Sequence, residues 1–84
     1  MNEEFIKLFF RESPIKVLLC CRQETFSSKI AKDIDGTYSH VVNVCKDFML
    51  MGLICSTKRG RRVFYTTTEK GRVLIKNIDN ILNL

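Results

Sequence analysis

The sequence predicts a mainly helical domain that carries one small β-hairpin. Three observations lead to this prediction. Apolar residues recur at helical spacing through most of the chain, capping residues and glycines separate these segments, and only one stretch combines β-branched and aromatic residues around a central glycine. The chain has 84 residues, of which 45% are hydrophobic, with four glycines and one proline. This length and composition indicate one folded domain over residues 1–84.

Two helices are expected at the start of the chain. The apolar residues of 3–11 recur at helical spacing, which predicts the first helix. Ser13 and Pro14 then supply a capping residue and a first-turn proline. They predict a second helix over 14–22.

The middle of the chain has the pattern of two helices joined by a tight turn. Ser27 is a suitable cap for a helix over 28–34, and Thr37 is a suitable cap for a longer helix over 37–51. Gly36, between them, can take the left-handed backbone conformation that such a turn needs. The expected arrangement is therefore helix, short turn, helix.

A β-hairpin and a last helix complete the predicted fold. Residues 53–57 and 62–67 are rich in β-branched and aromatic side chains, and the connection between them contains Gly60. Thr68 is a good cap for a helix over 69–83, and an acidic residue in the first turn favours the same start.

This order of elements resembles the winged helix-turn-helix domains of archaeal and bacterial transcription regulators, and is similar to MarR-like and ArsR-like proteins. Residues 28–34, 48–54 and 67–71 carry the resemblance, which extends over nearly the whole chain. Thr67 departs from it, because the family usually has a larger apolar residue there. The length is also expected to leave no room for a separate ligand-binding or dimerisation domain. The resemblance implies double-stranded DNA as partner, with a recognition helix (37–51) in the major groove and a wing (the hairpin) beside it.

The charge and the polar residues of these two elements agree with a DNA partner. Fourteen Lys and Arg outnumber nine Asp and Glu, which gives a net charge of +5. The recognition helix is expected to pack one stripe inward, formed by Val41, Val44, Cys45 and Phe48, and to leave its polar residues on the other side. Asn43 is the best candidate for contacting a base, because its amide can bond bidentately to adenine. The wing concentrates four cations without a nearby acid in the sequence, and Lys29 and Lys32 are candidates for flanking phosphate contacts. The full set of candidate DNA contacts is Thr37, Tyr38, Ser39, His40, Asn43, Lys46, Lys58, Arg59, Arg61 and Arg62.

The four cysteines predict neither a metal site nor a disulfide framework. Cys20, Cys21, Cys45 and Cys55 form no C-x-x-C pair, and His40 has no ligand spacing to any of them. Each lies in an apolar run, so we expect reduced core thiols in a reducing compartment.

An enzyme is not expected. The sequence contains no Ser/His/Asp or Cys/His constellation, no phosphate-binding glycine loop and no motif for a cofactor. The longest uncharged apolar stretch is too short to span a membrane, and acids at positions 3 and 4 do not fit a signal peptide. A cytoplasmic, nucleoid-associated protein is expected.

The two terminal helices have more apolar residues than a small core needs. Leu74, Ile78 and Ile81 in the last helix, with Phe9 and Phe10 in the first, predict a homodimer formed by these helices. Packing of the two helices on each other within one chain is the alternative. Two alternatives to a specific regulator also stay open, because one fold serves many functions: a protein interaction module within a larger assembly, and a nonspecific DNA-coating protein.

Overall fold

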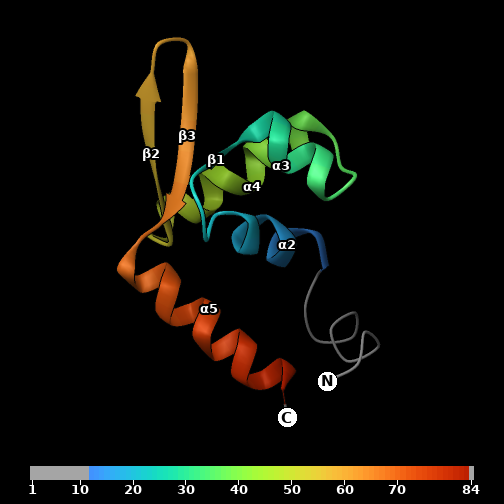
Figure 1. Cartoon of the computed structure of the whole chain (residues 1–84), viewed down its shortest axis with the longest axis vertical. Coiled ribbons are helices and arrows are strands. Elements are labelled where there is room, and N and C mark those ends of the chain that lie inside the picture. The colour runs from blue at the N-terminus through green and yellow to red at the C-terminus, as the bar shows by residue number, and fades with distance from the viewer. Residues whose placement is uncertain (1–11, 84) are drawn as a thin grey trace.

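A computed structural model describes residues 12–83, and the helix expected over 3–11 lies outside these residues. The predicted fold class is confirmed, and each expected element within these residues begins and ends within about two residues of its expected position. Figure 1 shows a group of helices from which a hairpin projects. The elements in chain order are α2 (Glu12–Cys20), β1 (Thr25–Phe26), α3 (Ser27–Asp33), α4 (Tyr38–Leu50), β2 (Ile54–Arg59), β3 (Arg62–Thr67) and α5 (Glu69–Leu82).

The core lies where α2, α3 and α4 meet the base of the sheet. The largest fully buried side chains come from α2, α3, α4 and the turn after α2, and they are Val17, Leu18, Cys21, Ile30, Val41 and Cys45. Helix α5 closes the core from the side away from the wing tip with Ile75 and Ile78, both 5% exposed (Figure 1). The buried stripe of α4 is the one that the sequence predicts, and it leaves the opposite face of that helix in solvent.

Two of the four expected caps form, and Ser13, expected to cap the second helix, instead lies inside α2. The Thr37 side chain accepts a hydrogen bond from the His40 backbone N–H (3.3 Å), and the Thr68 side chain accepts one from Gly71 (3.1 Å). The expected cap at Ser27 is wrong, because Ser27 is buried inside α3 and the cap position is Phe26, which makes no side-chain capping bond. Here the strand leads directly into the helix.

The turn between α3 and α4 also differs from its prediction. Asp35, with φ 54°, takes the left-handed conformation that was expected of Gly36. Aspartate tolerates this region better than most residues with a Cβ. The Gly36 backbone N–H donates to the carbonyl of Ala31 at 2.8 Å, which closes the end of α3.

The sheet has three antiparallel strands in the order β1-β3-β2. Residues 25–27 are β-leaning in sequence, but the sequence does not predict their pairing; the two residues of β1 pair as Thr25↔Tyr65 and Phe26↔Phe64. Strand β2 also extends beyond its expected end at 57, because Arg59 pairs with Arg62. Only Gly60 and Arg61 therefore form the turn, and the positive φ of Gly60 (63°) fits the first position of a two-residue hairpin turn.

In residues 12–83 there is no helix with both the length and the hydrophobicity that crossing a bilayer requires.

Candidate nucleic-acid interface

The outer face of α4 is polar and open to solvent. Its capping residue and the candidate side chains along the helix are all exposed, and Tyr38 keeps 62% of its surface. The face opposite carries the buried Val41, Val44 and Cys45, so the predicted division of the helix is confirmed. The exposed set from this element consists of Thr37, Tyr38, Ser39, His40, Asn43 and Lys46.

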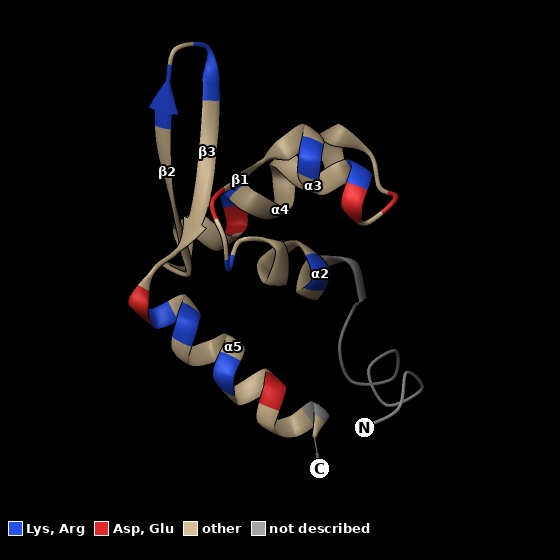
Figure 2. Ribbon diagram, in the orientation of Figure 1, with Lys and Arg blue, Asp and Glu red and all other residues tan. Residues whose placement is uncertain are grey.

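The second group of candidates lies at the free end of the wing. Figure 2 shows Lys and Arg at the tips of both β2 and β3, at the end of the hairpin that projects away from α5. Lys58, Arg59, Arg61 and Arg62 are the four cations there, and all are exposed. Because the hairpin holds them on two short strand ends, they form one concentrated positive charge.

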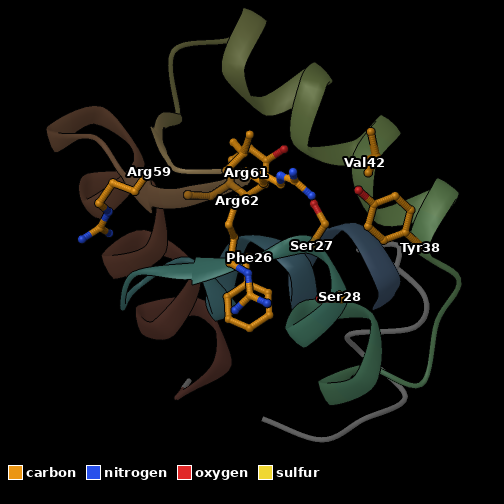
Figure 3. Close-up of a pocket in the computed structure, with 10 residues that line it drawn as sticks. Phe26, Ser27, Ser28, Tyr38, Val42, Arg59, Arg61 and Arg62 are labelled. Carbon is orange, nitrogen blue, oxygen red and sulfur yellow. The ribbon is translucent and has the colours of Figure 1, made fainter.

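A cleft of about 460 Å³ separates the wing from the start of α4, and Tyr38 is the one α4 candidate among its lining residues (Figure 3). Its lining combines guanidinium groups of the wing with the apolar Val63 and with Val42 and the Tyr38 ring from α4. A surface with a cationic side and an apolar side fits a sugar–phosphate backbone, whose phosphate is charged and whose sugar is largely apolar. Arg59, Arg61, Arg62, Phe26, Ser27, Ser28 and Tyr65 complete the lining.

Aromatic rings hold two of the wing arginines against the sheet. The Arg62 guanidinium carbon lies 4.1 Å from the centre of the Phe26 ring, and that of Arg59 lies 4.3 Å from the centre of the Phe64 ring. The two rings meet edge to face, with centroids 5.8 Å apart. The β1–β3 pairing brings these rings together, so a sequence prediction without β1 could not find this arrangement.

The expectation that no acid lies near the wing cations is wrong. Nη2 of Arg59 donates to Oε1 of Glu24, in the segment that leads into β1. The two residues are 35 positions apart in the chain, and only the sheet brings them together. Both side chains are about half exposed (54% and 50%), so solvent screens the pair.

The two lysines of α3 are exposed, and one of them is paired. Lys29 donates to Asp33 one turn later on the same helix, at 3.1 Å. This (i, i+4) pair is exposed and adds little stability, but it lowers the net charge at that end of the helix. Lys32 also lies in solvent on α3.

The cysteines differ from one another more than the sequence indicated. Cys21 and Cys45 are fully buried, as expected, and their hydrogen bond together with burial raises the pKa of the Cys21 thiol. Burial also raises the pKa of Cys20, which is partly buried. Cys55 is exposed on β2, so its prediction as a core thiol is wrong. Within the described part of the chain, no three His, Cys, Asp or Glu residues are grouped as a metal site would need.

Comparisons with known proteins agree on the fold. No family model matches the chain. An uncharacterized protein from Archaeoglobus fulgidus is 24% identical over 90 residues, which cover 100% of this chain and 95% of the relative. The crystal structure of AF1382 from the same organism superimposes with a TM-score of 0.88 at 22% identity, covering 94% of this chain and 93% of that one.

A larger protein contains the same arrangement. The transcriptional regulator PA4135 superimposes with a TM-score of 0.80 at 21% identity, and the match covers 92% of this chain and 60% of the regulator. The chain therefore has the winged helix-turn-helix fold that the sequence predicts.

Proposed function

We propose that this protein is a transcription regulator that binds double-stranded DNA without catalysing a reaction. Solved structures with the same fold include the transcriptional regulators PA4135, SlyA and HlyU from Vibrio vulnificus. In the proposed complex α4 is the recognition helix in the major groove, and the wing tip neutralises phosphates or enters the adjacent minor groove. The protein would act in the cytoplasm, on the DNA of the nucleoid.

One observation carries the proposal. The start of α4 and the cationic tip of the wing border the same cleft, although they are separate elements: Tyr38 and Val42 line it from α4, and three arginines line it from the wing (Figure 3). A domain that only needed solubility has no reason to hold both on one cleft. Duplex DNA requires this pair, because base edges are reached from a groove while the backbone charge beside that groove must be neutralised.

The residues of α4 divide between base and backbone contacts in this proposal. Asn43, exposed in the middle of the helix, reads a base edge, since its amide both donates and accepts. Ser39 and His40 in the first turn bond to base edges or phosphate, and Lys46 contacts phosphate. Thr37 caps the helix where backbone N–H groups point outward toward a phosphate.

A homodimer through α5 is part of the same proposal. Val73 and Leu74 keep 55% and 36% of their surface exposed on this helix. Ile78, which the sequence assigned to the dimer surface, is instead buried in the core, at 5% exposed. Ile81 is half-buried, and Phe9 and Phe10 lie outside the described residues, so on the described part of the chain the proposed contact centres on Val73 and Leu74. A two-fold axis there would place two recognition helices on successive turns of one face of DNA.

A binding assay at two salt concentrations tests the proposed function. The protein is titrated into labelled random-sequence duplex and into fragments selected from genomic DNA. A specific regulator binds the selected fragments more tightly and loses affinity steeply with salt. Equal affinity for all duplexes indicates a coating protein, and no binding at low salt refutes the proposal.

One surface feature favours an interaction module as the second candidate. Leu50 and Met51, at the end of α4, are 88% and 54% exposed, which is unusual for two adjacent large apolar residues. A protein partner covering them would give the domain a role within an assembly. Failure to bind any duplex would make this candidate the better one.

A further inference from the structure

We infer that Glu24 limits the affinity of the wing for DNA phosphate by neutralising Arg59, and so restrains binding that is independent of sequence. The inference rests on the DNA-binding function proposed above. Its basis is the ion pair between the Glu24 carboxylate and the Arg59 guanidinium, which attaches the segment before β1 to the end of β2.

Two contacts hold Arg59 in this position. Besides the ion pair, its guanidinium stacks on the Phe64 ring, 4.3 Å from the ring centre. Figure 3 shows the Arg59 side chain directed away from Tyr38 and Val42, which form the α4 side of the cleft. The stacking does not depend on Glu24, so the guanidinium keeps its place when the carboxylate is removed.

Within residues 12–83 the other wing cations have no such partner. Among the described residues, no carboxylate pairs with Lys58, Arg61 or Arg62. Glu24 therefore cancels one of four charges at the tip. The wing meets DNA with a smaller charge than its sequence indicates.

Glu24 reduces the attraction between Arg59 and a DNA phosphate in both possible arrangements of the complex. A phosphate that approaches Arg59 either finds it already neutralised or displaces the carboxylate, which then lies beside the polyanion. The ion pair is half exposed and weak in water, so Glu24 acts through net charge and not through stability. In either case the protein releases fewer counterions from DNA than it would without Glu24, and the difference corresponds to about one phosphate contact. Base contacts from α4 do not involve Glu24, so the restraint falls on the sequence-independent part of the affinity, which every duplex shares.

The test compares two variants that each remove one carboxylate and leave one arginine without its partner. Glu24→Gln frees Arg59, while Asp79→Asn frees Arg22, its partner at 3.9 Å. The Asp79 side chain is 46% exposed, close to the 50% of Glu24, but it lies on α5, away from the wing tip (Figure 1). Because both variants change the net charge equally, only a local effect of the wing can distinguish them.

Binding to a random-sequence duplex is measured by anisotropy across a salt series, after unfolding curves show that each variant is folded. Glu24→Gln should bind more tightly at low salt, with a salt slope steeper by about 0.9. The ratio of its affinity to that of the parent should fall about threefold between about 50 and about 200 mM salt, as that difference in slope requires. Asp79→Asn should keep the parent slope. The double variant Glu24→Gln/Arg59→Gln, which removes both charges of the pair, should return to it.

Two results would overturn the inference while the parent still binds DNA: a Glu24→Gln slope equal to that of Asp79→Asn, or weaker binding by Glu24→Gln. The second result would show that the ion pair prepares the wing for DNA. If the parent itself does not bind random duplex at low salt, the proposed function is refuted. This measurement needs no variant, so the two failures can be distinguished.

Discussion

Gly71 in α5 lies directly against the backbone of Leu53, at the junction between α4 and β2. A Cβ on Gly71 would come within 2.0 Å of the Leu53 carbonyl oxygen and 3.0 Å of its carbon. The same oxygen accepts a hydrogen bond from the Thr68 backbone N–H at 3.0 Å. This contact fixes the start of α5 to the base of the wing, so the glycine serves packing and not flexibility.

Gly71→Ala should therefore destabilise the domain by about 2–4 kcal/mol, because the added carbon forces α5 away from Leu53 and strains the hydrogen bond there. Helix propensity alone predicts the opposite sign, since alanine favours a helix interior by about 1 kcal/mol over glycine. Urea unfolding measures the difference. Gly36→Ala is the control, because its Cβ would meet only the flexible Ile34 side chain at 3.2 Å. Equal stability of the Gly71→Ala variant would contradict the packing argument.

The helices and the hairpin could be predicted because their signals are local. Thr37 and Thr68 cap helices whose apolar residues repeat at helical spacing, and both caps form as expected. The composition of β1 is β-leaning, but its pairing with β3 could not be predicted, because two residues carry no periodicity. The left-handed conformation of Asp35 was missed for a related reason. Which residue of a turn has a positive φ depends on the geometry of the whole turn and not only on where a glycine occurs.

The sequence predicts which residues form the candidate interface, but it does not predict that an acid neutralises one of the wing cations. The exposed polar face of α4 follows from its periodicity, and the cationic tip follows from the order of residues around Gly60. Glu24 is 35 residues from Arg59 and becomes its partner only after the sheet has formed. Pairings of this kind depend on tertiary structure, so no local pattern reveals them.

The exposed Cys55 should be the first thiol to react with a maleimide in the folded protein. Cys21 and Cys45 are excluded from solvent, and the raised pKa of Cys20 and Cys21 keeps these thiols protonated. Mass spectrometry of briefly labelled native protein should show one adduct, and Cys55→Ser should remove it. Fast labelling of the Cys55→Ser variant would contradict the assignment of the buried thiols.

Stability should fall as the pH rises above about 9. The pKa of Cys21 is raised in the folded state from 9.0, so above that pH the unfolded chain loses a thiol proton that the folded chain retains. The stability is complete below the unfolded pKa and is lost at about 1 kcal/mol per pH unit above it. The hydrogen bond with Cys21 lowers the pKa of Cys45, whose contribution to stability changes below pH 9 and stays constant above it, so urea unfolding in reductant at about pH 9 and about pH 10 measures the loss due to Cys21. The Cys21→Ala variant should lose less stability over the same pH range. If it loses as much as the parent, other groups are responsible for the pH dependence.

The proposed dimer should depend on Leu74. Sedimentation should give a dimer for the parent and a monomer for Leu74→Lys, because the new charge would be buried against its symmetry copy. Asn83→Lys adds the same charge at the exposed C-terminal cap of the same helix, nine residues beyond Leu74, and should remain dimeric. A parent that stays monomeric at high micromolar concentration would remove the dimer, and with it the expectation of two half-sites about one helical turn apart.

The wing and the recognition helix should fail in different ways when each is mutated. Replacing both Arg59 and Arg61 by Ala should weaken binding to every duplex and lower the salt slope by roughly one to two, since each lost phosphate contact removes about 0.9. Lys76→Ala is the control, because it removes an exposed cation from α5, away from the wing tip (Figure 1). If the double variant binds as the parent does at every salt concentration, the tip is only a solvated loop and the protein-interaction function becomes the better proposal.

Asn43→Ala should instead act on sequence preference. The lost bidentate contact should cost about 1–3 kcal/mol on the preferred site, which random-library selection with the parent identifies. Binding to random duplex and its salt slope should stay almost unchanged, because an amide neutralises no phosphate. Asn80→Ala makes the same truncation at an exposed position of α5 and should leave both duplexes unaffected. A uniform loss on all duplexes would place Asn43 on the backbone, and base recognition would then have to come from Ser39 or His40 in the first turn of α4.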